Sequence, residues 1–84
     1  MASSINDPAV RMYFIDMTLK RYVSEGTELV MTLEKNLERD VTFLHVNVIR
    51  KDGKMIQLQS DLSIDKNNWP RVSNELIAQL MMVG

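Results

Sequence analysis

The sequence predicts an α+β fold: a four-stranded antiparallel sheet built from two hairpins, followed by one C-terminal amphipathic helix. Apolar and polar residues alternate along much of the chain, and two short segments share one glycine-containing turn form. Near the C-terminus, apolar residues recur at helical spacing instead. Because 84 residues accommodate one hydrophobic core, we expect a flexible N-terminus over residues 1–9 and a single domain over residues 10–84.

The first predicted strand lies within residues 10–23. Drawn as a helix, this segment places its apolar residues on two opposite faces, Met12, Ile15, Leu19 and Val23 on one and Val10, Phe14 and Met17 on the other. Ile15, Met17 and Leu19 alternate with polar residues, as in a half-buried strand. We therefore expect a strand, although Asp7 and Pro8 would form a plausible helix start.

Two segments, Val23-Ser24-Glu25-Gly26-Thr27 and Arg50-Lys51-Asp52-Gly53-Lys54, predict the hairpin turns. Each places glycine after a polar pair, which is typical of a type I turn that ends in a left-handed bulge residue. The charged stretch from Lys35 to Asp40 then connects the two hairpins. A helix over residues 27–40 remains an alternative, because several apolar residues there share one helical face.

The turn form fixes the strand registers. In the first hairpin it pairs Leu19 with Met31 and Met17 with Leu33, so that one face is apolar. In the second hairpin it pairs Val48 with Ile56 and Val46 with Leu58. The remaining pairs, Asn47 with Gln57 and His45 with Gln59, are polar.

The C-terminal helix has the clearest pattern. Asn67 and Asn68 are capping candidates and Pro70 suits the first turn. One apolar stripe contains Val72, Leu76, Ile77, Leu80 and Val83. A single helix of this kind covers one face of the sheet and leaves the other face to solvent or to a partner.

The composition argues against several classes of protein. A net charge of −1 gives no strong overall attraction for nucleic acid, so such binding requires a local basic patch. The absence of cysteine excludes disulfides and thiol chemistry and fits a reducing compartment. No apolar run approaches the roughly 18 residues of a membrane span, and the first residues lack the features of a signal peptide. We expect a cytoplasmic protein without membrane contact.

Catalytic and metal-binding residues are scarce. The one histidine, His45, lies in mid-strand, and the carboxylates Glu34, Glu38 and Asp40 fit a solvated turn better than paired acid and base. Three glycines provide no phosphate-binding loop. We therefore expect no enzyme activity, no metal and no cofactor.

Apolar side chains remain after the core has been assigned. Met81 and Met82 fall outside the helical stripe, and Ile49 and Met55 fall on the sheet face away from the helix. Burial between two copies accounts for such residues, so these four form the expected dimer interface.

Basic residues concentrate at the second hairpin tip, with Arg50, Lys51 and Lys54. Lys20 and Arg21 precede Tyr22, which, with Phe43, offers a ring for stacking on a base. Positive charge beside exposed rings is how proteins hold single strands. The alternative is a hairpin edge kept soluble by its charge.

Two segments carry a resemblance to a known family: Gly53-Lys54-Met55, and Leu62-Ser63-Ile64-Asp65-Lys66-Asn67-Asn68-Trp69 followed by Val72 and Leu76. Over about the last third of the chain, the sequence resembles the transcriptional positive cofactor 4 family of single-stranded-DNA-binding proteins. The resemblance implies a homodimer joined partly through the C-terminal helices, with Trp69 packed between helix and sheet. The family's strongly basic strands are missing here, and Ile49 and Arg50 stand where the family has an aromatic residue.

Together these observations lead to the hypothesis of a non-enzymatic homodimer that binds single-stranded nucleic acid, as a transcription or replication accessory protein. Its expected contacts are Lys20, Arg21, Tyr22, Phe43, Arg50, Lys51 and Lys54. The alternative is a homodimeric protein-interaction module, a small regulator or inhibitor, that binds another protein through the surface of Phe43, Ile49 and Met55 and binds no nucleic acid.

Overall fold

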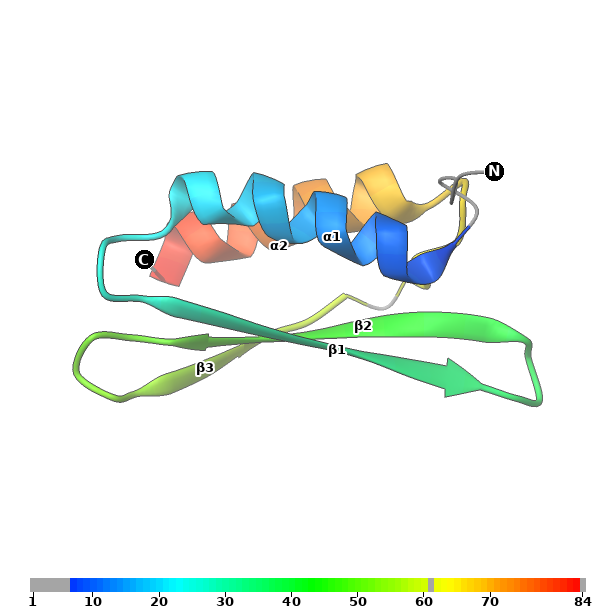
Figure 1. Cartoon of the computed structure of the whole chain (residues 1–84), viewed down its shortest axis with the longest axis horizontal. Helices are drawn as coiled ribbons and strands as arrows, with labels where there is room; N and C mark the ends of the chain where they lie inside the picture. Colours follow the sequence, from blue (N-terminus) through cyan, green and yellow to red (C-terminus); the bar gives the residue numbers. More distant parts are fainter. Residues whose placement is uncertain (1–6, 61, 84) are drawn as a thin grey trace.

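The computed structural model describes residues 7–60 and 62–83. Its elements are α1 (Pro8–Leu19), the short 3-10 helix η1 (Lys20–Tyr22), β1 (Glu28–Asn36), β2 (Val41–Ile49), β3 (Met55–Leu58) and α2 (Trp69–Val83). The three strands form an antiparallel sheet in the order β1-β2-β3. Both helices lie side by side on one face of this sheet and run in the same direction (Figure 1). The predicted α+β class, antiparallel sheet and C-terminal helix are confirmed.

The prediction of a strand between residues 10 and 23 is wrong, because Pro8–Leu19 forms a helix. The Asp7 carboxylate accepts a hydrogen bond from the backbone N–H of Ala9 at 2.9 Å, and Pro8 occupies the first turn. The two apolar faces that argued against a helix have different neighbours. Ile15 and Leu19 are fully buried in the core, whereas Phe14, on the other face, stacks on Trp69 of α2.

The first predicted hairpin is therefore also wrong. Residues 23–27 connect η1 to β1 through a turn in which the Thr27 N–H donates to the Ser24 carbonyl at 3.1 Å. Residues 17 and 19 belong to α1, so neither pairs with a strand. Instead β1 pairs with β2, with Met31 opposite Val46 and Leu33 opposite Leu44. The helical alternative for residues 27–40 is likewise excluded, because nine of these residues form β1.

The second hairpin matches its prediction. Val48 lies opposite Ile56 and Val46 opposite Leu58. The Gly53 N–H donates to the Arg50 carbonyl and the Arg50 N–H to the Lys54 carbonyl, each at 2.8 Å. Gly53 has φ +88°, the left-handed conformation that the bulge requires.

The start of α2 depends on Asp65 rather than on the two predicted asparagines. The Asp65 carboxylate accepts hydrogen bonds from the backbone N–H groups of Asn67 and Asn68, at 2.9 and 2.7 Å. The hydrogen bond from the Asn68 N–H is the largest of the effects that lower the Asp65 pKa. The hydrogen bonds from Asn67 and Ser63 and the charge of Arg11 act in the same direction, whereas burial of the carboxylate raises the pKa. This carboxylate therefore stabilises the loop in its charged form.

The core lies between the helices and one face of the sheet. The buried apolar residues are Ile15 and Leu19 of α1, Leu44, Val46 and Val48 of β2, Leu58 of β3, Ile64, and Val72, Leu76 and Leu80 of α2. All the strand residues in this set belong to the alternation that faces the helices. Buried Arg11 donates from Nε to the Ile64 carbonyl and so connects α1 to the loop before α2.

The N-terminal boundary differs in part from the expected one. Pro8 and Ala9, which we placed in a flexible N-terminus, belong to α1. Residues 1–6 lie outside the described part of the chain.

Candidate nucleic-acid interface

The helix layer and the sheet meet at one end of the molecule. The turn after η1, the β2–β3 hairpin tip and the last turn of α2 lie together there, at the left in Figure 1. Gly26, with φ +89°, faces the Lys51 side chain so closely that a Cβ at residue 26 would stand 3.4 Å from two of its carbons. The left-handed turn thus brings the chain from α1 against the hairpin tip.

A pocket of about 150 Å³ opens at this junction. Its apolar side chains are Val23, Val48, Ile56, Leu80 and Val83, and its polar ones include Ser24, Glu25 and Thr27. Tyr22, Arg50 and Lys51 also line it. We call these three residues the basic corner: one aromatic ring and two cations beside an apolar floor.

Tyr22 reaches the basic corner because α1 is a helix. The helix ends at Leu19, η1 adds one tight turn, and Tyr22 is its last residue. About half of its surface, 47%, is exposed. A ring in this position can stack on a planar group that also contacts the two cations.

Arg50 and Lys51 are positioned by the hairpin turn. The backbone of Arg50 donates to and accepts from its hairpin partners, and both side chains are exposed. Lys54, on the far side of the same turn, is exposed but does not line the pocket. The Asp52 carboxylate accepts from the Lys54 N–H at 3.0 Å, which adds a negative charge beside Lys54.

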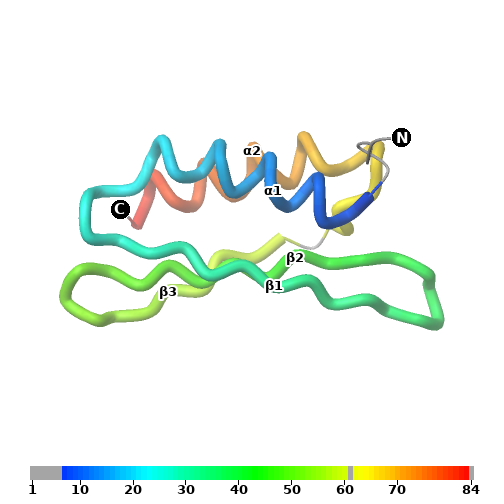
Figure 2. The backbone as a smooth tube through the Cα atoms, viewed as in Figure 1, coloured from blue at the N-terminus to red at the C-terminus, as the bar shows by residue number. Residues whose placement is uncertain are grey.

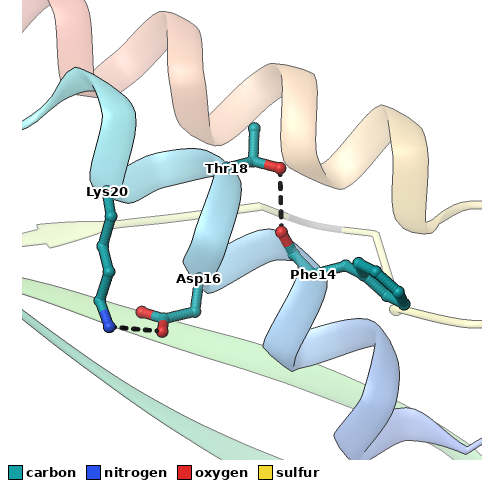
Figure 3. Close-up of polar contacts among 4 residues, drawn as sticks. All are labelled: Phe14, Asp16, Thr18 and Lys20. Atoms are coloured by element: carbon teal, nitrogen blue, oxygen red, sulfur yellow. Dashed lines mark hydrogen bonds and ion pairs between the residues drawn. The ribbon is translucent and has the colours of Figure 1, made fainter.

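Lys20 has a different environment. Its ammonium lies 3.0 Å from the Asp16 carboxylate one helical turn earlier (Figure 3). In the same helix the Thr18 hydroxyl donates a hydrogen bond to the Phe14 carbonyl. It lines a groove between α1 and β1 with Leu29 and Met31. Arg21 is exposed in η1, next to Tyr22. Lys20 therefore faces the edge of β1, and Tyr22 is the residue of η1 that lines the basic-corner pocket.

Phe43 does not share the site with Tyr22. It lies near the start of β2, opposite Glu34, on the sheet face that carries no helix. The Arg39 guanidinium stands over its ring, 5.9 Å from the centroid. The turn that joins β1 to β2 forms the end of the molecule opposite the basic corner (Figure 2).

The four residues of the expected dimer interface fall into two separate pairs. Ile49 and Met55 are opposite each other on the sheet face without helices, which we call the open face. Met81 and Met82 lie on α2 and are 67% and 86% exposed. Because the sheet separates the open face from the helix layer, the structure does not bring these pairs into one patch.

His45 has one close polar neighbour. Its Nε2 is 2.6 Å from the Glu34 carboxylate on the adjacent strand, and the side chains of His45 and Glu34 are 40% and 68% exposed. Within residues 7–60 and 62–83, no group of three or more histidines or carboxylates is arranged to hold a metal ion.

The sequence pattern does not predict the pocket, because a strand over residues 10–23 would place Tyr22 in the sheet. The pocket residues outside the expected contacts are Val23, Ser24, Glu25 and Thr27 and the apolar floor from β2, β3 and α2. The Asp7-Pro8 helix start was the available indication, since a helix from Pro8 carries Tyr22 to the far end of the sheet.

The part of the chain that the structure describes contains no helix long and apolar enough to cross a membrane. Comparisons of the chain with family models, with curated proteins and with solved structures found no match.

Proposed function

We propose that the protein is a non-enzymatic homodimer that binds single-stranded nucleic acid at the basic corner. The observation that carries this proposal is the pocket that brings Tyr22 together with Arg50 and Lys51, although they come from distant parts of the sequence. An exposed ring beside two unburied cations is the combination that binds a base by stacking and its phosphates by charge.

In the proposed mechanism, Arg50 and Lys51 contact neighbouring phosphates, while Tyr22 stacks on a base. Arg21, which precedes Tyr22 in η1, and Lys54, across the hairpin turn from Lys51, are exposed cations that can add further phosphate contacts. A guanidinium donates two parallel hydrogen bonds to a phosphate, whereas lysine acts as a flexible point charge. Because these contacts are with the phosphate backbone and the faces of the bases, binding discriminates little between nucleic-acid sequences.

The resemblance to the transcriptional positive cofactor 4 family supports the ligand class only. Its segments include the hairpin tip, at Gly53-Lys54-Met55, and the start of α2, at Trp69. Trp69 is half-buried and stacks on Phe14, with ring centroids 6.2 Å apart. The proposed role of Trp69 is structural: it packs against α1.

The first experiment is a titration of a labelled single-stranded oligonucleotide, followed by fluorescence anisotropy at several salt concentrations. Contacts with about three phosphates give a slope of log K against log salt near −2. Tyr22→Ala should weaken binding by roughly tenfold, since stacking contributes about 1–3 kcal/mol per base. Tyr13→Ala is the matched control, because Tyr13 is also exposed but lines the groove beside β1. An oligonucleotide affinity that changes neither with salt concentration nor with Tyr22→Ala would refute the proposal.

A second candidate function is a protein-interaction module that uses the open face. Val30, Phe43, Ile49 and Met55 all lie there, and Val30 and Met55 are exposed. Exposed apolar groups on an uncovered sheet are suited to binding another protein. Met55→Lys should then abolish partner binding and leave oligonucleotide binding intact, whereas Lys51→Glu should do the reverse.

A further inference from the structure

The pocket at the basic corner contains one negatively charged side chain, Glu25, beside the cations Arg50 and Lys51. Glu25 is exposed, and its carboxylate forms no ion pair with any residue that the structure describes. A carboxylate repels phosphate, so it weakens the binding of a nucleic-acid backbone unless the ligand also donates a hydrogen bond to it. Glu25 therefore favours binding only if it accepts a hydrogen bond from a base.

The turn between η1 and β1 holds Glu25 at the pocket. The Thr27 N–H donates to the Ser24 carbonyl at 3.1 Å, and Glu25 and Gly26 are the two central residues of the turn that this bond closes. Gly26 has φ +89° and lies against the Lys51 side chain. This close approach fixes the turn, and Glu25 with it, next to the hairpin tip.

The pocket has the size of a single aromatic ring. Its volume is about 150 Å³. An engineered protein cavity of about 150 Å³ binds benzene. The floor of the pocket is aliphatic, and the Tyr22 ring lines it as well. A pyrimidine ring would therefore lie between an aromatic and an apolar surface, as flipped bases do in enzyme pockets. A purine has two fused rings, of which this volume accommodates one.

The polar side chains of the pocket differ in what they offer to the Watson–Crick edge, on which unpaired bases are recognised. The hydroxyls of Ser24 and Thr27 both donate and accept, so they adapt to any base. Glu25 is the one lining side chain that only accepts. Cytosine presents its N4 amino group to such an acceptor, whereas thymine and uracil have the carbonyl oxygen O4 at that ring position. Two acceptors facing each other are left without a donor, so Glu25 favours cytosine.

We propose that the pocket binds one cytosine base of the single strand and selects it over thymine and uracil through Glu25. The N4 amino group donates to the Glu25 carboxylate, while Tyr22 stacks on the ring. This inference rests on the proposed function, because Arg50 and Lys51 hold the neighbouring phosphates while the base enters the pocket. The remaining contacts are with the backbone, so the preference is confined to one nucleotide for each pocket.

Two single strands of equal length, one of deoxycytidine and one of deoxyuridine, test the inference. Their bases have the same ring and differ in the groups on the Watson–Crick edge. Fluorescence anisotropy of the labelled strands at neutral pH should give an affinity about tenfold higher for the cytidine strand, as expected for one hydrogen bond to a charged group.

Glu25→Gln should remove most of this preference, because an amide both donates and accepts and so pairs with either base. Glu28→Gln is the matched control, since Glu28 is also exposed but does not line the pocket. The two substitutions change the net charge equally, so any general gain in affinity should be similar. Glu28→Gln should keep the preference of about tenfold for the cytidine strand.

The possible failures of the inference and of the proposed function are distinguishable. Equal affinities for the two strands, with binding that still weakens with salt and with Lys51→Glu, would overturn the inference and leave the proposed function standing. A preference that survives Glu25→Gln would also overturn the inference. A deoxyadenosine strand that binds more tightly than the cytidine strand would show that the pocket does not select a single ring. If no strand binds, the proposed function fails and the inference fails with it.

Discussion

Asp65 connects the loop after β3 to the first turn of α2 through its bonds to the N–H groups of Asn67 and Asn68. These bonds favour the charged carboxylate, chiefly through Asn68, and hold its pKa below the ordinary value of 3.8. A pKa that is lower in the folded chain stabilises the fold above the unfolded pKa, and this contribution disappears as the pH falls through the folded pKa.

Asp65→Ala should therefore lower the free energy of unfolding by about 1 kcal/mol at neutral pH, as for other lost helix-capping carboxylates. The difference from the native chain should shrink as the pH falls below 3.8 toward the lower folded pKa. Urea unfolding at neutral and at acid pH measures both values. A difference that stays constant with pH would show that the charge of Asp65 is unimportant.

Trp69 packs against the core while its ring stacks on Phe14, which is itself 43% exposed. Because Trp69 is only half-buried, Trp69→Ala should cost about 2–3 kcal/mol, less than the roughly 3–5 kcal/mol of a fully buried aromatic residue. Phe14→Leu should cost about 1 kcal/mol through loss of the ring pair. Thermal unfolding gives both values. A neutral Phe14→Leu would contradict the contact between the helices.

At the level of elements, α1 shows most clearly where sequence reasoning failed. Its apolar residues occupy two faces because it packs on the sheet with Ile15 and Leu19 and contacts α2 with Phe14. A helix with two apolar faces does not show the single apolar stripe by which a surface helix is predicted. The alternation of apolar and polar residues around Met17 arose by chance and resembled that of a strand. The C-terminal helix, which buries one stripe, was predicted correctly.

The second hairpin could be predicted because its information is local. Gly53 specifies the turn, and the alternating residues on each side fix the register. The same turn form at Gly26 connects a helix to a strand instead. Local turn chemistry therefore defines a bend, whereas the identity of the preceding element depends on distant packing partners.

Alanine substitutions in α1 distinguish its helix from the strand that the alternation suggested. Ile15→Ala should lower the free energy of unfolding by about 2–5 kcal/mol, because Ile15 is fully buried. Met17→Ala should cost less than about 1 kcal/mol, since Met17 is 43% exposed. In a strand both residues would share the buried face. Equal losses in urea unfolding would therefore contradict the helix.

The whole molecule has two unlike ends and two unlike faces. Helices cover one sheet face, and the open face carries apolar residues, so each functional hypothesis uses a different surface (Figure 1). The cations of the hairpin tip could be predicted from the sequence. The pocket could not, because the position of Tyr22 depends on how α1 packs across the entire sheet.

A pair of charge reversals tests whether nucleic acid binds at the basic corner. Lys51 lines the pocket. Lys66 is exposed and lies three residues before α2, whose first turn is at the other end of the molecule (Figure 1). Both substitutions to glutamate change the net charge equally. Oligonucleotide affinity, measured by anisotropy at low salt, should fall at least tenfold for Lys51→Glu and less than threefold for Lys66→Glu. Equal losses, or no loss with Lys51→Glu, would contradict the proposed site.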